Sequence, residues 1–257
     1  APNGFKGISA AAAIIFFSYI GFDAVSTAAE EAKNPAKDMP FGIIMSLVIC
    51  TVLYVLLSIV MTGMAPWKQL GTAEPMITAL QYASGPPALL NFSRFIIALG
   101  AVIAMGSVLL VFQLGQPRIF YSMARDGLLP PWFKRVHPRF RTPANGTILT
   151  GVLVGVPAAF LDIESALDVC NIGTLFAFAI VSIGVVVLRV VEPERHRPFR
   201  VPLVWVVGPL GALACAFIMA GLPVQAWERF GLWLGLGLIV YLGYGARHSR
   251  LRQSPPA

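Results

Sequence analysis

Long apolar runs with almost no charge recur along this 257-residue chain, and they restrict its fold more than any other feature. Seven runs each extend over about 18 residues or more, which is enough to cross the hydrocarbon core of a bilayer. In lipid every main-chain polar group must be paired inside the protein, so such runs form α-helices. The runs cover residues 8–32, 41–63, 92–121, 144–161, 166–191, 201–223 and 227–246. The sequence therefore predicts an all-α membrane protein with seven transmembrane helices.

The composition agrees with a lipid environment. Hydrophobic residues make up 57% of the chain and charged residues only 12%, about half the charged share of an ordinary soluble domain. Three cysteines, Cys50, Cys170 and Cys215, lie singly in apolar runs, without the spacing of a metal site or a disulfide framework. We interpret them as packing residues, and we expect no metal and no bound cofactor.

Lysine and arginine are distributed unevenly among the connections between the runs. Of the 19 such residues, 15 lie in one alternating set of connections and four in the other. The larger set is Lys33, Lys37, Arg118, Arg125, Lys134, Arg135, Arg139, Arg141, Arg189, Arg195, Arg197, Arg200, Arg247, Arg250 and Arg252, and the smaller set is Lys6, Lys68, Arg94 and Arg229. Positively charged connections tend to stay in the cytoplasm. We therefore predict a multi-pass protein of the plasma (inner) membrane, with its amino terminus outside and a basic carboxyl-terminal tail inside.

The net charge of +7 suggests nucleic-acid binding at first sight. Residues 125–143, RDGLLPPWFKRVHPRFRTP, mix basic and aromatic side chains as some nucleic-acid surfaces do. The positive-inside bias explains the same residues as a cytoplasmic loop beside anionic lipid. We expect membrane lipid as a partner and no nucleic acid.

The first run contains a glycine and a carboxylate midway, at Gly21 and Asp23 in FFSYIGFDAVSTAAEEAKNP, residues 16–35. Glycine allows the backbone to leave the helix. A break at membrane depth is tolerated only where it lines a protein-buried or water-filled cavity, and a carboxylate inside a span is costly and usually functional. The sequence therefore predicts a helix that is broken near Gly21, beside a cavity.

The ends of the two half-helices have predictable chemistry. If the first half ends just before the glycine, the carbonyls of Phe16, Phe17 and Ser18 lack helical partners and carry the negative end of the helix dipole, which suits a ligand ammonium. Asp23 is expected to cap the second half by accepting from amides near Ser26. A capping role alone for Asp23, and close helix packing for the glycine, are the alternatives.

Two motifs carry a family resemblance. Residues 16–43, FFSYIGFDAVSTAAEEAKNPAKDMPFGI, resemble the sixth transmembrane segment and the following loop of cationic amino acid transporters, which belong to the amino acid, polyamine and organocation superfamily. Residues 115–143, GQPRIFYSMARDGLLPPWFKRVHPRFRTP, resemble the end of the eighth segment and the loop after it. The other runs match mainly in length, order and orientation. The resemblance implies the carboxyl-terminal half of such a transporter, segments six to twelve.

The resemblance implies a leucine-transporter-like fold of two inverted five-helix repeats followed by two extra helices. Residues 1–192 would form the second repeat, and residues 193–257 the two peripheral helices and the tail. The chain would lack the first five helices and half of the substrate site. A missing amino-terminal half is therefore an expected partner, and a non-transporting membrane fragment is an alternative to a permease for the chain alone. The last two runs could also form a homodimer face.

The resemblance also implies a substrate site, because family transporters bind an amino acid midway across the membrane at the broken segments. Carried onto this sequence, the carbonyls of Phe17, Ser18 and Ile20 would receive the α-ammonium, and the Phe17 ring would close over it. Gly21 and Asp23 complete this candidate set.

Ion coupling is the second expectation from the resemblance. Ser107 lies near the middle of the third run, where it could contact an ion or a lysine that replaces it. Helix packing through small residues is the alternative for this serine. We expect coupling to protons rather than sodium, with simple exchange also open.

Three functional classes compete. The leading one is an amino acid permease, a secondary active transporter that works by alternating access. A seven-helix ligand-sensing receptor has the same topology but gives no reason for a broken first helix; a retinal protein is excluded because every lysine lies at or beyond a span end. An enzyme is not expected, because no span carries paired carboxylates, a metal-ligand pattern or a serine with a histidine.

Overall fold

The computed structural model describes residues 4–72, 74–160 and 162–249, which form helices and no strand. Arg250 and Arg252 of the predicted basic tail lie outside the described residues. The α-helices are α1 (Gly4–Ile15), α2 (Pro35–Met64), α3 (Pro75–Leu80), α4 (Pro87–Arg125), α5 (Ala144–Ala158), α6 (Ile163–Val191), α7 (Val204–Ala220), α8 (Val224–Val240) and α9 (Ala246–His248). The 3-10 helices are η1 (Phe16–Tyr19), η2 (Asp23–Glu31), η3 (Trp67–Gln69) and η4 (Pro131–Lys134), and a π-helical turn, η5 (Tyr241–Gly245), joins α8 to α9.

Five helical segments of the described chain are long and apolar enough to cross a membrane. They cover Gly4–Thr27, Pro35–Met64, Pro87–Arg125, Ser165–Val191 and Val224–His248. The predicted runs 144–161 and 201–223 coincide with two shorter apolar helices, α5 and α7. The all-α membrane class is therefore confirmed, whereas the count of seven spans and the division at residue 192 stay predictions.

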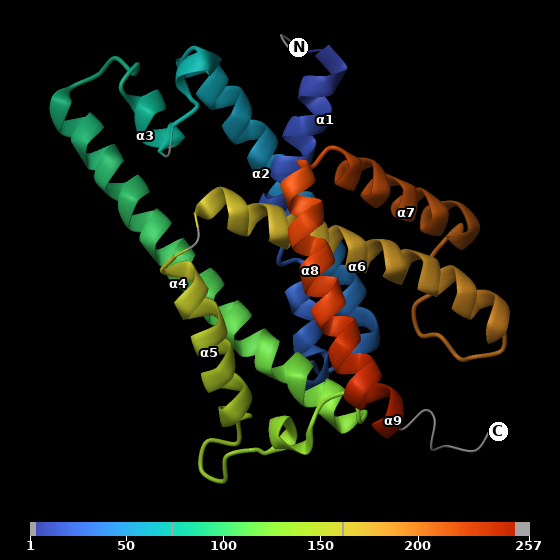
Figure 1. Cartoon of the computed structure of the whole chain (residues 1–257). Coiled ribbons are helices and arrows are strands. Elements are labelled where there is room, and N and C mark those ends of the chain that lie inside the picture. The colour runs from blue at the N-terminus through green and yellow to red at the C-terminus, as the bar shows by residue number, and fades with distance from the viewer. Residues whose placement is uncertain (1–3, 73, 161, 250–257) are drawn as a thin grey trace.

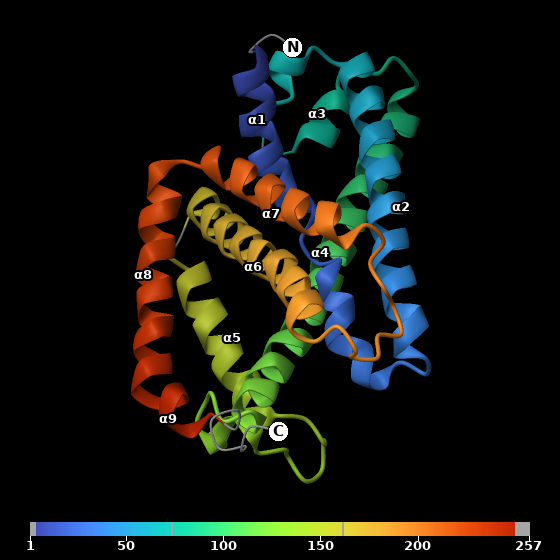
Figure 2. The same cartoon turned by 90° about the vertical axis from the view of Figure 1, so that its right-hand side faces the viewer.

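The described helices run mainly between two ends of the molecule. The start of α1 and the short helix α9 lie at opposite ends of the molecule in both views (Figure 1 and Figure 2). Helices α6 and α7 lie side by side and run obliquely to α2 and α8. Helix α3 lies in the connection between α2 and α4, at the end where α1 begins.

The buried core is small and lies where α1, α6 and the turn between α7 and α8 meet. Its members are apolar and almost inaccessible: Ala13, Ile172, Leu175, Met219, Leu222 and Ala226. By contrast, α2 has no buried residue, and its large apolar side chains are mostly exposed. Apolar surface of this extent must be covered by lipid or by further protein.

A buried polar side chain ties the first half-helix to this core. Asn171 of α6 is 2% exposed, and its side-chain amide donates to the Ala13 carbonyl at 3.1 Å. The Ala13 carbonyl belongs to the last turn of α1, where helical carbonyls lose main-chain partners. Asn171 supplies one such partner and so joins the end of the first half-helix to the core.

Helix α6 begins with a side-chain cap. The Asp162 carboxylate accepts from the Ser165 hydroxyl at 2.8 Å and from the Ser165 amide at 2.9 Å. These hydrogen bonds, the hydroxyl's first, lower the pKa of the Asp162 carboxyl below its usual value. An ionised aspartate at this position satisfies an amide that the helix cannot pair, which explains why the apolar run starts its helix here.

Glycine allows α6 and α7 to approach closely. A Cβ atom added at Gly208 of α7 would collide with Cγ2 of Val186 and lie 3.2 Å from the Ser182 carbonyl oxygen. Gly211, one turn later, faces the Ser182 side chain. Small residues at a helix interface are the usual means of close packing in membranes.

We therefore expect Gly208→Ala to destabilise the protein by about 1–3 kcal/mol, the usual cost of overpacking. The measurement is the thermal unfolding midpoint of the purified protein in detergent. Gly184→Ala is the matched control, because a Cβ atom at Gly184 of α6 meets no atom within 4 Å. Equal midpoints for the two variants would contradict the close contact.

Candidate functional site

The first span is broken where the sequence predicts. Helix α1 ends at Ile15 and continues as the 3-10 turn η1, and the chain turns at residues 20–22 before η2 begins at Asp23. Gly21 has a φ of +119°, a conformation that is essentially restricted to glycine. The break near Gly21 is therefore built into the backbone.

Asp23 stabilises the break in a different way from the predicted one. Its carboxylate accepts from the Gly21 amide at 3.2 Å, and η2 has no side-chain cap. The Ser26 hydroxyl instead donates to the Asp23 carbonyl at 2.6 Å. The prediction that Asp23 caps amides near Ser26 is wrong, because Asp23 lies within the first turn and its side chain points back to an amide that the break leaves unpaired.

The sequence suggested that the carbonyls at the end of the first half-helix are free. In the structure, two of them accept hydrogen bonds. The Phe17 carbonyl accepts from the Ile20 amide at 3.1 Å, because the tight turn brings together residues three apart. The Ser18 carbonyl accepts from the Tyr54 hydroxyl of α2 at 2.8 Å. No described donor bonds to the Ile20 carbonyl. This last carbonyl remains a free acceptor at the break.

A cavity of about 390 Å³ lies at the break, between the broken segment, α2 and α4. Its lining comprises Ser18, Tyr19, Ile20, Gly21, Phe22 and Val25 from the broken segment, Ser46, Leu47, Cys50 and Tyr54 from α2, and Ser107, Val108, Val111 and Phe112 from α4. Four predicted site residues are thus brought together around one space, namely Ser18, Ile20, Gly21 and Ser107.

Two predicted site residues do not line this cavity. Phe17 is 41% exposed, and Asp23 is turned to the Gly21 amide. Ser107 lines the cavity, and its hydroxyl donates to the Ile103 carbonyl at 2.9 Å. The oxygen of Ser107 therefore keeps its acceptor capacity toward the cavity.

Sequence reasoning missed Tyr54 and Phe112. The Phe112 ring lies 3.8 Å from the position that a Cβ atom of residue 21 would take, so it covers the break from α4. Tyr54 was detectable in principle, since it is a phenol in the middle of an apolar run. Such a side chain usually finds a hydrogen-bond partner when it is buried.

The described side chains that line the cavity carry no charge. Its polar groups are hydroxyls, one thiol and main-chain carbonyls, and no acidic or basic side chain of the described residues lines it. Carbonyl oxygens can accept from an ammonium group, and valine, leucine and phenylalanine side chains suit an apolar ligand portion.

Aromatic rings pack the side of the broken segment that faces α6. The Phe16 ring and the Phe22 ring contact the ring of Phe178 on α6, with centroids 6.2 and 5.3 Å apart respectively. Phe16 also packs against the buried core. The broken segment is therefore held on its α6 side and open to the cavity on its α2 and α4 side.

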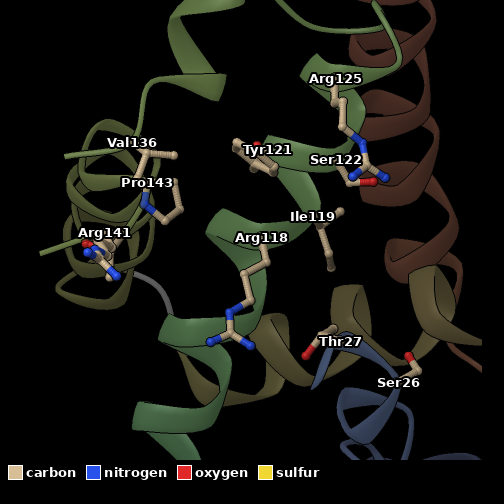
Figure 3. Close-up of a pocket in the computed structure, with 11 residues that line it drawn as sticks. Ser26, Thr27, Arg118, Ile119, Tyr121, Ser122, Arg125, Val136, Arg141 and Pro143 are labelled. Atoms are coloured by element: carbon tan, nitrogen blue, oxygen red, sulfur yellow. The ribbon is translucent and has the colours of Figure 1, made fainter. Parts of the chain in front are cut away.

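A second cavity of about 580 Å³ lies further along η2 and α4. Figure 3 shows Ser26 and Thr27 on one side, Val136, Arg141 and Pro143 on the other, and the α4 side chains between them. Three arginines line it, Arg118, Arg125 and Arg141. We place the candidate ligand site in the smaller cavity, because only that one contains the broken backbone.

Known proteins resemble nearly the whole chain. A family model described as "Amino acid permease" matches residues 1–234. The chain is 44% identical to the methylthioribose transporter of Bacillus subtilis (strain 168) and 43% identical to the branched-chain amino acid permease BcaP of the same organism, in each case over 98% of the chain. It is 43% identical, over 75% of the chain, to the vacuolar cationic amino acid transporter 4 of Arabidopsis thaliana.

The chain spans only part of these relatives. It covers 54% and 53% of the two bacterial proteins and 31% of the plant one, in agreement with the predicted half. The relatives are named as transporters and permeases, not as enzymes, as the sequence analysis expected. Their names include vacuolar and mitochondrial proteins, so they do not specify one membrane.

Gly21→Ala is expected to destabilise the protein by about 1–3 kcal/mol, because a side chain is strained at this backbone conformation. The thermal unfolding midpoint in detergent measures the effect. Gly63→Ala in α2 is the control: a Cβ atom there meets no atom within 4 Å, and alanine favours a helix. A Gly21→Ala protein as stable as this control would show that the backbone at the break is not glycine-specific.

Proposed function

Because the chain belongs to the amino acid permease family, we propose that, together with the amino-terminal part that its relatives possess, it transports amino acids by alternating access. One observation carries the proposal: the first span breaks at Gly21, and the break opens into an uncharged cavity. Such breaks are where transporters of inverted-repeat folds bind their substrates.

The proposed substrates are neutral amino acids with apolar side chains. No carboxylate among the described residues lines the cavity, and the Asp23 carboxylate, two residues after Gly21, accepts from the Gly21 amide. A cationic side chain would lose its hydration there without gaining a partner, which costs several kcal/mol. The relatives that match over 98% of the chain include one named for branched-chain amino acids, whereas a relative named for cationic ones matches over 75%.

The substrate ammonium is proposed to bind the carbonyls of Ile20, Ser18 and Phe17. The Ile20 carbonyl is free, and the other two each accept one hydrogen bond and keep a second lone pair. Asp23 supports the site by holding the Gly21 amide. Closure of the Phe17 ring over the substrate is also proposed, and it requires this half-exposed side chain to move toward the cavity.

Proton coupling, with Ser107 as a contact for an ion or for a substituting lysine, extends the same proposal. The support is the position of Ser107 in the cavity wall. The proposed location is the plasma membrane, with the amino terminus outside. The support for this orientation is the bias of basic residues toward alternate connections. A homodimer through α7 and α8 stays a prediction.

We expect the full-length protein, reconstituted in proteoliposomes, to take up radiolabelled leucine in a saturable manner and faster under an inward proton gradient. Excess valine is expected to compete, and excess arginine is not. Arginine uptake that leucine does not inhibit would overturn the neutral substrate class. Specific leucine binding without any flux would favour the receptor alternative over transport.

Gly21→Leu in the full-length protein is expected to abolish uptake while the protein still inserts in the membrane. The added side chain forbids the glycine backbone conformation and approaches Phe112 across the cavity. Uptake per inserted molecule is the measurement, and Gly63→Leu in α2 serves as the control with open space around it. Normal uptake by the Gly21 variant would refute the role of the break.

A further inference from the structure

Tyr54 links the middle of α2 to the broken segment. Its hydroxyl donates to the Ser18 carbonyl at 2.8 Å, across 36 residues of sequence. Both residues line the same cavity. The distance is ideal for a hydrogen bond from a hydroxyl to an oxygen.

The Tyr54 ring is itself held in place. It packs edge-on against the ring of Tyr19, with centroids 5.3 Å apart and an interplanar angle of 86°. Edge-to-face packing is a favourable arrangement for two aromatic rings. Since Tyr19 follows Ser18 directly in the chain, the phenol is attached to the break by both its ring and its hydroxyl.

The Ser18 carbonyl depends on this contact. No described main-chain amide donates to it, because the amide that would continue the tight turn, that of Gly21, donates to the Asp23 carboxylate instead. A carbonyl oxygen has two lone pairs. The Tyr54 hydroxyl occupies one of them and leaves the other available to a ligand.

We propose that Tyr54 is a positioning residue for recognition of the ligand's α-ammonium. By holding the Ser18 carbonyl in one orientation, it determines how well that oxygen receives the ammonium, and it joins α2 to the binding break. This inference rests on the proposed function, in which main-chain carbonyls of the break bind an amino acid. It adds a side chain from another helix that acts through one of those carbonyls.

Loss of the Tyr54 hydroxyl is expected to weaken binding only of ligands that carry an α-ammonium. Without the phenol hydroxyl, the Ser18 carbonyl loses its partner and its fixed direction, while the apolar wall of the cavity is unchanged. Tyr54→Phe should therefore weaken binding of a ligand that has an α-ammonium. A ligand with the same carbon skeleton but no amine should bind as it does to the parent protein.

The experiment compares two probes on the purified full-length protein, leucine and 4-methylpentanoate, which is leucine without its amine. Leucine affinity is measured directly with radiolabel, and 4-methylpentanoate as an inhibitor of that binding. For Tyr54→Phe we expect the leucine Kd to rise about two- to twelvefold, the usual effect of losing one hydrogen bond, with the inhibition constant of 4-methylpentanoate unchanged. Tyr241→Phe is the matched control, since it removes a phenol hydroxyl that is outside the cavity lining.

An unchanged leucine Kd, or an equal rise for both probes, would overturn the inference, because a merely structural role weakens both ligands alike. The unfolding midpoint of Tyr54→Phe shows whether the variant is folded, and Tyr54→Leu repeats the comparison if it is not. Failure of the parent protein to bind leucine would instead overturn the proposed function itself. The two failures are therefore distinguishable.

Discussion

Within a bilayer every main-chain N–H and C=O group needs a partner inside the protein, and the rest of this structure depends on how the segment around Gly21 meets that need. The helix stops at a glycine conformation, and side chains then satisfy two of the main-chain groups that lose their helical partners. The Gly21 amide bonds to Asp23, and the Ser18 carbonyl bonds to Tyr54. The Ile20 carbonyl, to which no described donor bonds, lies beside a cavity whose described lining carries no charge.

The two sides of the broken segment differ in a way that fits a binding site. On the α6 side, Asn171 holds the Ala13 carbonyl, and Phe178 contacts two rings of the segment. On the α2 and α4 side, Tyr54 holds the segment through a hydrogen bond to Ser18 and an edge-on contact with the Tyr19 ring, and a cavity lies between the segment and the two helices. A ligand in that cavity would meet carbonyl oxygens from a backbone that α6 and Tyr54 keep in place before the ligand binds.

Local features were predictable from the sequence, and distant contacts were not. The break at Gly21 was predicted because a glycine and a nearby aspartate lie in the middle of an apolar run. The long apolar runs themselves were found from local composition alone. Helices α5 and α7 are shorter than the apolar runs 144–161 and 201–223, because apolar character continues beyond the residues that keep helical geometry. The Asp23 contact was misassigned because an aspartate near a helix start can bond either forward or backward. The Tyr54 contact required knowledge of which face of α2 packs against the break, which an almost uniformly apolar helix does not reveal.

The most direct measurement is an experimental structure of the full-length protein with leucine bound. The account predicts a break at Gly21 and a leucine ammonium within about 2.7–3.2 Å of the Ile20 and Ser18 carbonyl oxygens, the range of ordinary N–H···O hydrogen bonds. A continuous helix through Gly21, or leucine seated instead in the arginine-lined cavity beside Arg118 and Arg141, would contradict it.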